Sequence, residues 1–317
     1  MSAEALSAAP EETTRAPERP IKEVRKAASS PAITTAIVVL TLLWTIPTFG
    51  LLVSSVRPAA DVVNSGWWTF FEHPHFTFSN YHDVLFNSGF GGTGGLFPFV
   101  INSIAITIPG TLIPIAIAAM AAYALSWIRF RGSDFIFFMV FALQVVPLQM
   151  ALIPLLRLYT HGAHVGTLQV LPSLPKGYYS VWISHTMFGL PLAIFLLHNF
   201  ISRLPNDLME AAKIDGASHF RIFRTIVLPL STPALASLAI LQFLWVWNDL
   251  LVAITFAGGQ NKVLPLTGRL AQLSGSLGAH PELLTAGAFV AILLPLIVFF
   301  SLQRYFVRGL LAGSVKG

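Results

Sequence analysis

The sequence predicts an all-α, polytopic membrane protein with six transmembrane helices and one polar, helix-forming loop between two of them. Three observations support this fold class. Of the 317 residues, 55% are hydrophobic and only 10% are charged, and the mean hydropathy is +0.71. The apolar residues form long uninterrupted segments, and most Lys and Arg residues fall in alternate connections between these segments. A soluble globular domain is therefore excluded.

Six segments each contain about the 20 apolar residues that a helix needs to cross a hydrocarbon core of about 30 Å. We place them at residues 33–53, 99–128, 135–156, 179–200, 233–256 and 284–302. The second segment is longer than a span requires, and Pro109-Gly110 inside it predicts a kink or a break. Residues 32–317 therefore form one membrane domain.

Residues 1–31 are polar, rich in Ala, Glu, Pro and Arg, and show no apolar periodicity, which predicts a disordered tail. A signal peptide is not expected, because the first apolar run is too long and reaches Arg57 without a good cleavage site. The positive-inside rule orients the chain. On one side lie only Arg57, Arg157, Lys176, Lys262 and Arg269, so the other side, with both termini and residues 201–233, is cytoplasmic.

The net charge of +5 does not indicate nucleic-acid binding, because the basic residues are scattered between apolar spans and form no patch. The chain has no cysteine, which excludes disulfides, thiolate metal sites, a cysteine nucleophile and lipid attachment through cysteine.

The cytoplasmic 201–233 loop predicts two short helices joined by a sharp turn. Pro205 suits the first turn of a helix, in which Leu208, Ala211 and Ala212 share one face. Gly216 permits the left-handed backbone that reverses the chain. Ser218 can cap a second helix, which Pro229 would stop. Such a knob could enter a cleft in another protein, although an ordinary solvated loop is the alternative.

The 201–233 loop resembles the EAA loop of binding-protein-dependent ABC importer permeases. A Glu-Ala-Ala tripeptide alone would be weak evidence, but many identities at fixed spacing are specific. They are Glu210, Ala211, Ala212, Asp215, Gly216, Ala217, Phe223, Ile226, Leu228, Pro229 and Pro233.

Further motifs are similar to the carbohydrate-type, and in particular the maltose-type, permeases of this superfamily. They are Asn80-Tyr81, Ala122-Tyr123-Ala124-Leu125, Val146-Pro147, Ile153-Pro154, Trp247-Asn248-Asp249 and the C-terminal residues 306–317. The resemblance covers residues 33–317 and leaves the N-terminal tail outside.

The resemblance implies the type I ABC importer fold and a permease subunit that translocates a sugar or small oligosaccharide delivered by an extracytoplasmic binding protein. It implies a multi-pass protein of the bacterial plasma membrane, with a second homologous permease and two ATPase subunits as partners. No enzyme activity is expected. No lysine follows a glycine, so the chain has no Walker A loop, and ATP and Mg would be bound by the ATPase subunits.

The resemblance also implies that the coupling contact with the ATPase includes Glu210, Ala211, Ala212, Asp215, Gly216 and Ala217. Glu210 would pair with a basic residue in the ATPase cleft, and Gly216 would provide the turn. The C-terminal segment 308–317 resembles a second contact of this kind, and a frayed end is its alternative.

Polar side chains within spans are costly, so they should face a cavity or a partner. Gln242, Trp245 and Asp249 fall on one stripe of the fifth span, where rings and hydrogen-bonding groups suit a sugar. The alternative places Asp249 near the outer interface, where Trp is common. Asn248 is a further candidate beside Asp249. Weaker candidates for the substrate pathway are Gln144, Gln149, Trp182 and His185, with Asn102 on the second span, and hydrogen-bonded packing is the alternative for His185.

Three other features complete the expectations. The long loop 258–283 would contact the binding protein by resemblance, or simply connect two spans. Glu72, His73, His75 and His82 are not expected to bind a metal, and the glycine run 91–95 is read as a hinge. A secondary transporter would need more ionisable residues at mid-membrane, and an intramembrane enzyme a His-Glu-x-x-His motif or paired carboxylates.

Overall fold

The structure is a computed structural model that describes residues 31–87, 95–128, 130–258, 262–276 and 280–314, without the side chains of residues 275–276 and 305–314. The predicted disordered tail and most of the glycine run 91–95 lie outside this part. The chain divides into two compact units, residues 1–51 and 52–317. Helix α2 (Pro31–Ser55) begins in the first unit and corresponds to the first predicted span.

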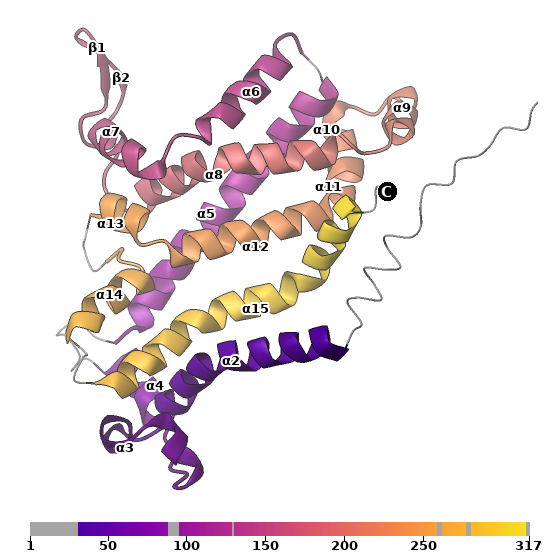
Figure 1. Cartoon of the computed structure of the whole chain (residues 1–317). Coiled ribbons are helices and arrows are strands. Elements are labelled where there is room, and N and C mark those ends of the chain that lie inside the picture. The colour runs from indigo at the N-terminus through magenta and orange to yellow at the C-terminus, as the bar shows by residue number, and fades with distance from the viewer. Residues whose placement is uncertain (1–30, 88–94, 129, 259–261, 277–279, 315–317) are drawn as a thin grey trace, which may run out of the picture. The chain divides into compact units, whose positions relative to one another are not determined.

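Four helices of the second unit lie side by side (Figure 1): α5 (Phe97–Tyr123), α8 (Tyr178–Ile201), α12 (Thr232–Asn248) and α15 (Pro281–Ser314). Helix α12 packs against α5, α8 and α15. Small residues allow the close approach, because Gly189 of α8 faces α12 and Gly110 of α5 faces both α8 and α12. The prediction of a mainly helical membrane protein is confirmed.

Four helices of the described chain are long and apolar enough to cross a membrane, and two bent pairs raise the number to six if each pair is one span. Counted in this way, the number agrees with the six predicted spans, and the two bent pairs are residues 133–161 and residues 219–248. The third predicted span consists of α6 (Ser133–Leu143) and α7 (Leu148–His161), bent by 101°. Pro147 precedes α7 and cannot donate a backbone hydrogen bond, which explains why the predicted helix 135–156 breaks there.

The fifth predicted span, residues 233–256, is also broken. Helix α12 ends at Asn248, Asp249 is extended, and α13 (Leu251–Ala257) begins afterwards. Asp249 accepts hydrogen bonds from the amides of Val252 (3.4 Å) and Ala253 (3.0 Å), so it caps α13 instead of continuing α12. Of the kink or break expected at Pro109-Gly110, the break is absent: α5 runs through both Pro109 and Pro114, and a π turn (Ala124–Ile128) follows it.

The connections gather at two ends of the bundle (Figure 1). One end carries α9 (Asn206–Ile214), α10 (His219–Ile222), a π turn (Phe223–Val227) and α11 (Leu228–Leu230). The opposite end carries α3 (Ala59–Asn64), the 3-10 turn Trp67–Phe71, α4 (Ser79–Phe86), the antiparallel hairpin β1 (Ala163–Val165) and β2 (Leu168–Leu171), α13 and α14 (Leu266–Ser276). These are the two groups of connections that the Lys and Arg distribution separates.

The predicted loop 258–283 is partly helical, because it contains α14. Leu264, Leu266 and Leu273 are buried in a core cluster with Phe99 of α5 and Trp247 of α12. The apolar side chains expected around 264–273 therefore fold back onto the bundle.

Candidate functional site

The turn between α9 and α10 is a helix C-terminus closed by glycine. Gly216 has φ +73°, and the Gly216 amide donates to the carbonyl of Lys213 at 3.0 Å. The Ala217 amide donates to the carbonyl of Ala212, also at 3.0 Å. These two bonds form the Schellman motif, which needs a left-handed residue at the glycine position. The predicted reversal at Gly216 is thus present, and a Cβ there would contact nothing within 4 Å.

The second helix begins as predicted, because the Ser218 side chain accepts a hydrogen bond from the Arg221 amide. The prediction that Pro229 ends it is wrong. The helical path continues through Pro229 to Leu230, and a 73° bend then leads into α12.

One side of the 201–233 loop is anchored in the core. Met209, Ala212, Ile222 and Val227 are buried, together with Leu197 and Ile201 of α8. The Tyr123 hydroxyl and His219 Nδ1 lie 3.0 Å apart, and the indole of Trp127 donates to the carbonyl of Ile201 at 3.0 Å. The loop is therefore fixed to both α5 and α8.

The other side of the 201–233 loop is exposed and partly apolar. Glu210, Ala211, Asp215 and Gly216 are exposed, whereas Ala212 is buried and Ala217 is half-buried. Leu208 and Ala211 do not share the buried face with Ala212, because Met209 takes that position. Ile214 and Phe220, which are not among the residues predicted for the coupling contact, are 86% and 71% exposed. The signal in the sequence was an apolar residue at a position that faces away from the core. Exposed apolar patches of this kind mark interaction sites.

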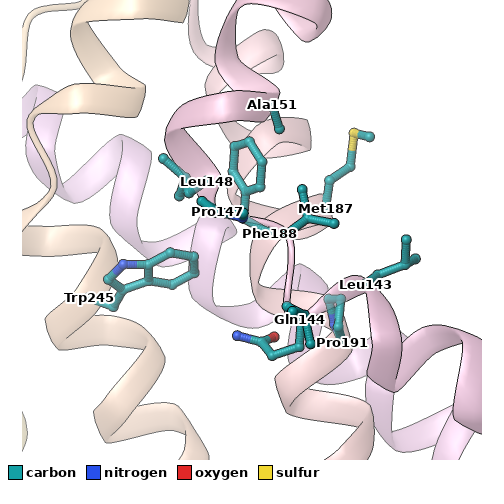
Figure 2. Close-up of a pocket in the computed structure, with 11 residues that line it drawn as sticks. Leu143, Gln144, Pro147, Leu148, Ala151, Met187, Phe188, Pro191 and Trp245 are labelled. Carbon is teal, nitrogen blue, oxygen red and sulfur yellow. The ribbon is translucent and has the colours of Figure 1, made fainter.

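A hollow of about 410 Å³ lies at the elbow between α6 and α7 (Figure 2). Gln144 and Trp245 point into it from the elbow and from α12, so two predicted pathway residues from distant parts of the chain meet there. Apolar residues form the rest of the wall. They are Leu143, Val145, Val146, Pro147, Leu148, Ala151, Met187, Phe188 and Pro191.

His185 and Asp249 form a buried pair behind Trp245. His185 Nε2 and Asp249 Oδ2 are 3.7 Å apart, and the imidazole side chain is completely buried. The Trp245 and His185 rings meet edge to face, with centroids 6.0 Å apart. The predicted stripe of Gln242, Trp245 and Asp249 is therefore interrupted, since Asp249 lies beyond the end of α12 and caps α13.

The remaining predicted pathway residues do not line the elbow hollow. Gln242 is buried and donates to the carbonyl of Gly110 at 3.2 Å, and the Trp182 indole donates to the carbonyl of Ala105 at 2.9 Å. Asn248 lines a separate hollow of about 340 Å³ between α12 and α15, and Gln149 is exposed on α7. Their role in transport stays a prediction.

At the opposite end, α5 holds the segment that precedes α14. Asn102 Nδ2 donates to the carbonyl of Leu264 at 3.0 Å, and Asn102 Oδ1 accepts from the Tyr178 hydroxyl at 2.6 Å. The amide of Leu266 donates to Ser103 Oγ at 2.8 Å. Arg269 of α14 lies over the Phe99 ring, 5.4 Å from its centroid, and burial lowers the pKa of its guanidinium group.

Within the described residues, no group of three or more His, Asp or Glu side chains could hold a metal ion. Of the four residues considered as metal ligands, His75 is paired with Asp61 at 3.2 Å, and His82 lies 3.5 Å from Asp83.

Comparisons with known proteins agree on one family. Residues 110–311 match the model of the family described as "Binding-protein-dependent transport system inner membrane component". The chain is 51% identical, over 285 residues, to the osmoprotective compounds uptake permease protein of Synechocystis sp., covering 89% of this chain and 90% of that protein. It is 56% identical, over 245 residues, to the alpha-glucoside transport system permease protein of Rhizobium meliloti, covering 77% of this chain and 61% of that protein.

A solved structure has the same fold. A bacterial ABC transporter involved in the import of the acidic polysaccharide alginate contains a chain that matches with a TM-score of 0.64 at 20% identity. The match covers 90% of this chain and 96% of that chain. At this identity the match bears on the fold alone.

Proposed function

Because this chain belongs to the family of inner membrane components of binding-protein-dependent transport systems, we propose that it translocates a sugar or small oligosaccharide for an ATP-driven ABC importer. It is a multi-pass membrane permease and a transport subunit rather than an enzyme. The relative at 56% identity carries an alpha-glucoside in its name, which makes a small neutral glucoside the best first substrate to test.

The complete transporter in this proposal contains a second, similar permease, two ATPase subunits and an extracytoplasmic sugar-binding protein. ATP and Mg belong to the ATPase subunits. The Lys and Arg distribution supports an orientation in the bacterial plasma membrane with both termini and the 201–233 loop in the cytoplasm. The binding protein would deliver the sugar at the end that carries α13 and α14.

The elbow between α6 and α7 supports a substrate pathway at the 410 Å³ hollow. Residues 144–147 interrupt the helical hydrogen-bond ladder, and Val145 of the elbow is exposed on the isolated chain. Interrupted backbone at membrane depth is tolerated only where it lines a water-filled cavity or is covered by protein. The Trp245 ring can stack on the apolar face of a sugar ring, and the Gln144 amide can bond its hydroxyls.

The observation that carries the coupling role is the division of the 201–233 loop into an anchored and an exposed side. The buried side fixes the loop on α5 and α8, and the exposed side carries Glu210 together with the apolar Ile214 and Phe220. An ATPase cleft that receives this surface would bury the apolar side chains and pair the carboxylate. A loop that only connects two spans needs neither feature.

The test uses the complete transporter in proteoliposomes, with uptake of labelled sugar and ATP hydrolysis measured together. Glu210→Lys reverses the proposed contact charge, and Gly216→Pro removes both the left-handed backbone and the amide that bonds Lys213. Both variants are expected to insert normally, to lose most uptake and to lose the stimulation of ATP hydrolysis by the loaded binding protein.

Two matched variants serve as controls. Glu72→Lys makes the same change at an exposed glutamate at the other end of the bundle. Gly132→Ala is the control for Gly216→Ala. Both glycines are left-handed, Gly132 with φ +92°, and both have open space where a Cβ would lie. Normal uptake by Glu210→Lys and Gly216→Pro would refute the coupling role.

A further inference from the structure

We propose that residues 67–78, which we call the aromatic foot, lie in the interfacial region of the lipid bilayer at the end of the bundle opposite the 201–233 loop. The foot would be a lipid-contacting element rather than an aqueous loop or a docking surface for another protein. The inference requires only that the chain spans a membrane and does not depend on the nature of the transported substrate.

Exposed aromatic side chains distinguish the aromatic foot from other connections. Trp68, Phe71, Phe76 and Phe78 are between 63% and 74% exposed. The half-buried Phe70 ring packs against the exposed Phe76 ring, with centroids 4.7 Å apart. Aromatic rings concentrate at the membrane–water interface, where an apolar body and the headgroup region meet.

The position of the aromatic foot in the chain places it at the level of the interface. Helix α2, an apolar span, ends at Ser55, and the foot follows within about a dozen residues. After the foot, α4 leads to α5, which is the next apolar span. A connection between the ends of two spans begins and finishes at the edge of the hydrocarbon core.

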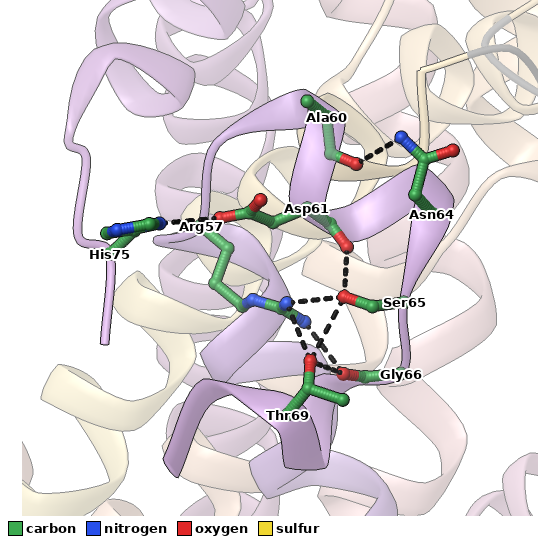
Figure 3. A network of polar contacts seen from close by, with 8 residues as sticks. All are labelled: Arg57, Ala60, Asp61, Asn64, Ser65, Gly66, Thr69 and His75. Atoms are coloured by element: carbon green, nitrogen blue, oxygen red, sulfur yellow. Dashed lines mark hydrogen bonds and ion pairs between the residues drawn. The ribbon is translucent and has the colours of Figure 1, made fainter. Parts of the chain in front are cut away.

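A buried polar network holds the aromatic foot in place (Figure 3). Arg57 is only 3% exposed, and its guanidinium group donates to the carbonyl of Gly66 (2.9 Å), to Ser65 Oγ (2.8 Å) and to Thr69 Oγ1 (3.1 Å). The side chain of Asn80 donates to the carbonyls of Ser55 (3.0 Å) and Arg57 (2.8 Å). The rings are therefore exposed on an ordered element.

Gly66 allows the Trp68 ring to pack against the backbone. A Cβ at Gly66 would lie 2.4 Å from an atom of the Trp68 ring, so the indole rests directly against the glycine backbone. Only glycine permits this arrangement, because no real Cβ approaches another atom so closely. One part of the indole is thus supported by the protein, while the rest stays exposed.

The charge distribution indicates which part of a membrane the foot contacts. Residues 58–128 contain no Lys or Arg, and Arg57 is turned inward. The exposed ionisable groups of the foot are Glu72, His73 and His75, and His75 lies 3.2 Å from Asp61. A surface with exposed rings and no exposed Lys or Arg fits the apolar part of the interface, and attraction to anionic headgroups is not required.

The absence of native cysteine makes the test direct. Single cysteines replace Phe71 and Phe78, any cysteines of the other subunits are replaced by serine, and the complete transporter in nanodiscs is labelled with a nitroxide. Oxygen, which partitions into lipid, and a water-soluble nickel chelate then compete as relaxing agents. Val165, 72% exposed at the hairpin of the same end, is the aqueous control, and Leu293, 59% exposed on α15, is the lipid reference.

We expect the ratio of oxygen to nickel accessibility at positions 71 and 78 to exceed that at position 165 several-fold and to approach that at position 293. This ratio should be unchanged by anionic lipid content and by salt. Nickel accessibility equal to that at position 165 would overturn the proposal. Protection from both agents would also overturn it, since that result indicates cover by another protein.

Discussion

Gly189 is the position at which a single methyl group should test the packing of the bundle. A Cβ at Gly189 of α8 would lie 2.6 Å from Nε2 and 2.9 Å from Oε1 of Gln242 on α12. Gln242 in turn donates to the carbonyl of Gly110 on α5 at 3.2 Å. Gly189→Ala therefore disturbs the place where three helices meet.

The magnitude follows from the two ways in which the clash can be relieved. If the Gln242 amide turns away, its bond to Gly110 is lost, which costs about 1 kcal/mol. If the amide stays, α8 and α12 must separate, and overpacking of this kind costs about 1–3 kcal/mol. We expect Gly189→Ala to lower the free energy of unfolding by about 1–3 kcal/mol.

The assay is a double-mutant cycle on the purified transporter, unfolded chemically in detergent. Gln242→Ala removes the atoms that the new methyl group would meet. Gly189→Ala should then cost much less in the Gln242→Ala background than in the native one, so the two changes are coupled by about 1 kcal/mol or more. Equal effects of Gly189→Ala in both backgrounds would refute the reasoning.

Three further outcomes follow from the described contacts. Arg57→Leu removes the three hydrogen bonds that the guanidinium group donates to Gly66, Ser65 and Thr69, so it should destabilise residues 58–78 by about 1–3 kcal/mol and speed chymotrypsin cleavage there, and Arg57→Lys should not restore protection. Asn102→Ala removes the donor to the Leu264 carbonyl, so amide hydrogen exchange should accelerate over residues 262–268 while the 201–233 loop is unchanged. Trp245→Ala removes a ring from the elbow hollow and should lower sugar uptake at least several-fold, without loss of assembly with the ATPase; unchanged uptake would remove Trp245 from the pathway.

The number and order of the spans could be predicted from sequence because burial in lipid demands long apolar segments. The bends could not. The apolar segment continues across the elbow at residues 144–147, so hydropathy does not register the 101° change of direction. Pro147 was visible as a helix breaker, yet Pro109 and Pro114 have the same chemistry and α5 continues through them. Tertiary packing decides which proline bends a span.

The turn and the helix cap of the 201–233 loop were predictable because their signals are local. Gly216 closes α9 and Ser218 caps α10 through contacts within a few residues. The candidate pathway was predictable only in part, since the meeting of Gln144 with Trp245 depends on how distant helices pack. Helical periodicity placed Asp249 on the same stripe as Trp245 because it assumed that the helix continues past Asp249. The helix in fact ends one residue before it, at Asn248.

The continuity of α5 has a mechanical consequence. Its 27 residues form one continuous helix of about 40 Å. At one end of α5 the Tyr123 hydroxyl is hydrogen-bonded to His219, and near the other end Asn102 donates to the carbonyl of Leu264. A displacement of the α5 end that contacts the 201–233 loop would therefore be carried along one continuous helix to the end that holds Leu264.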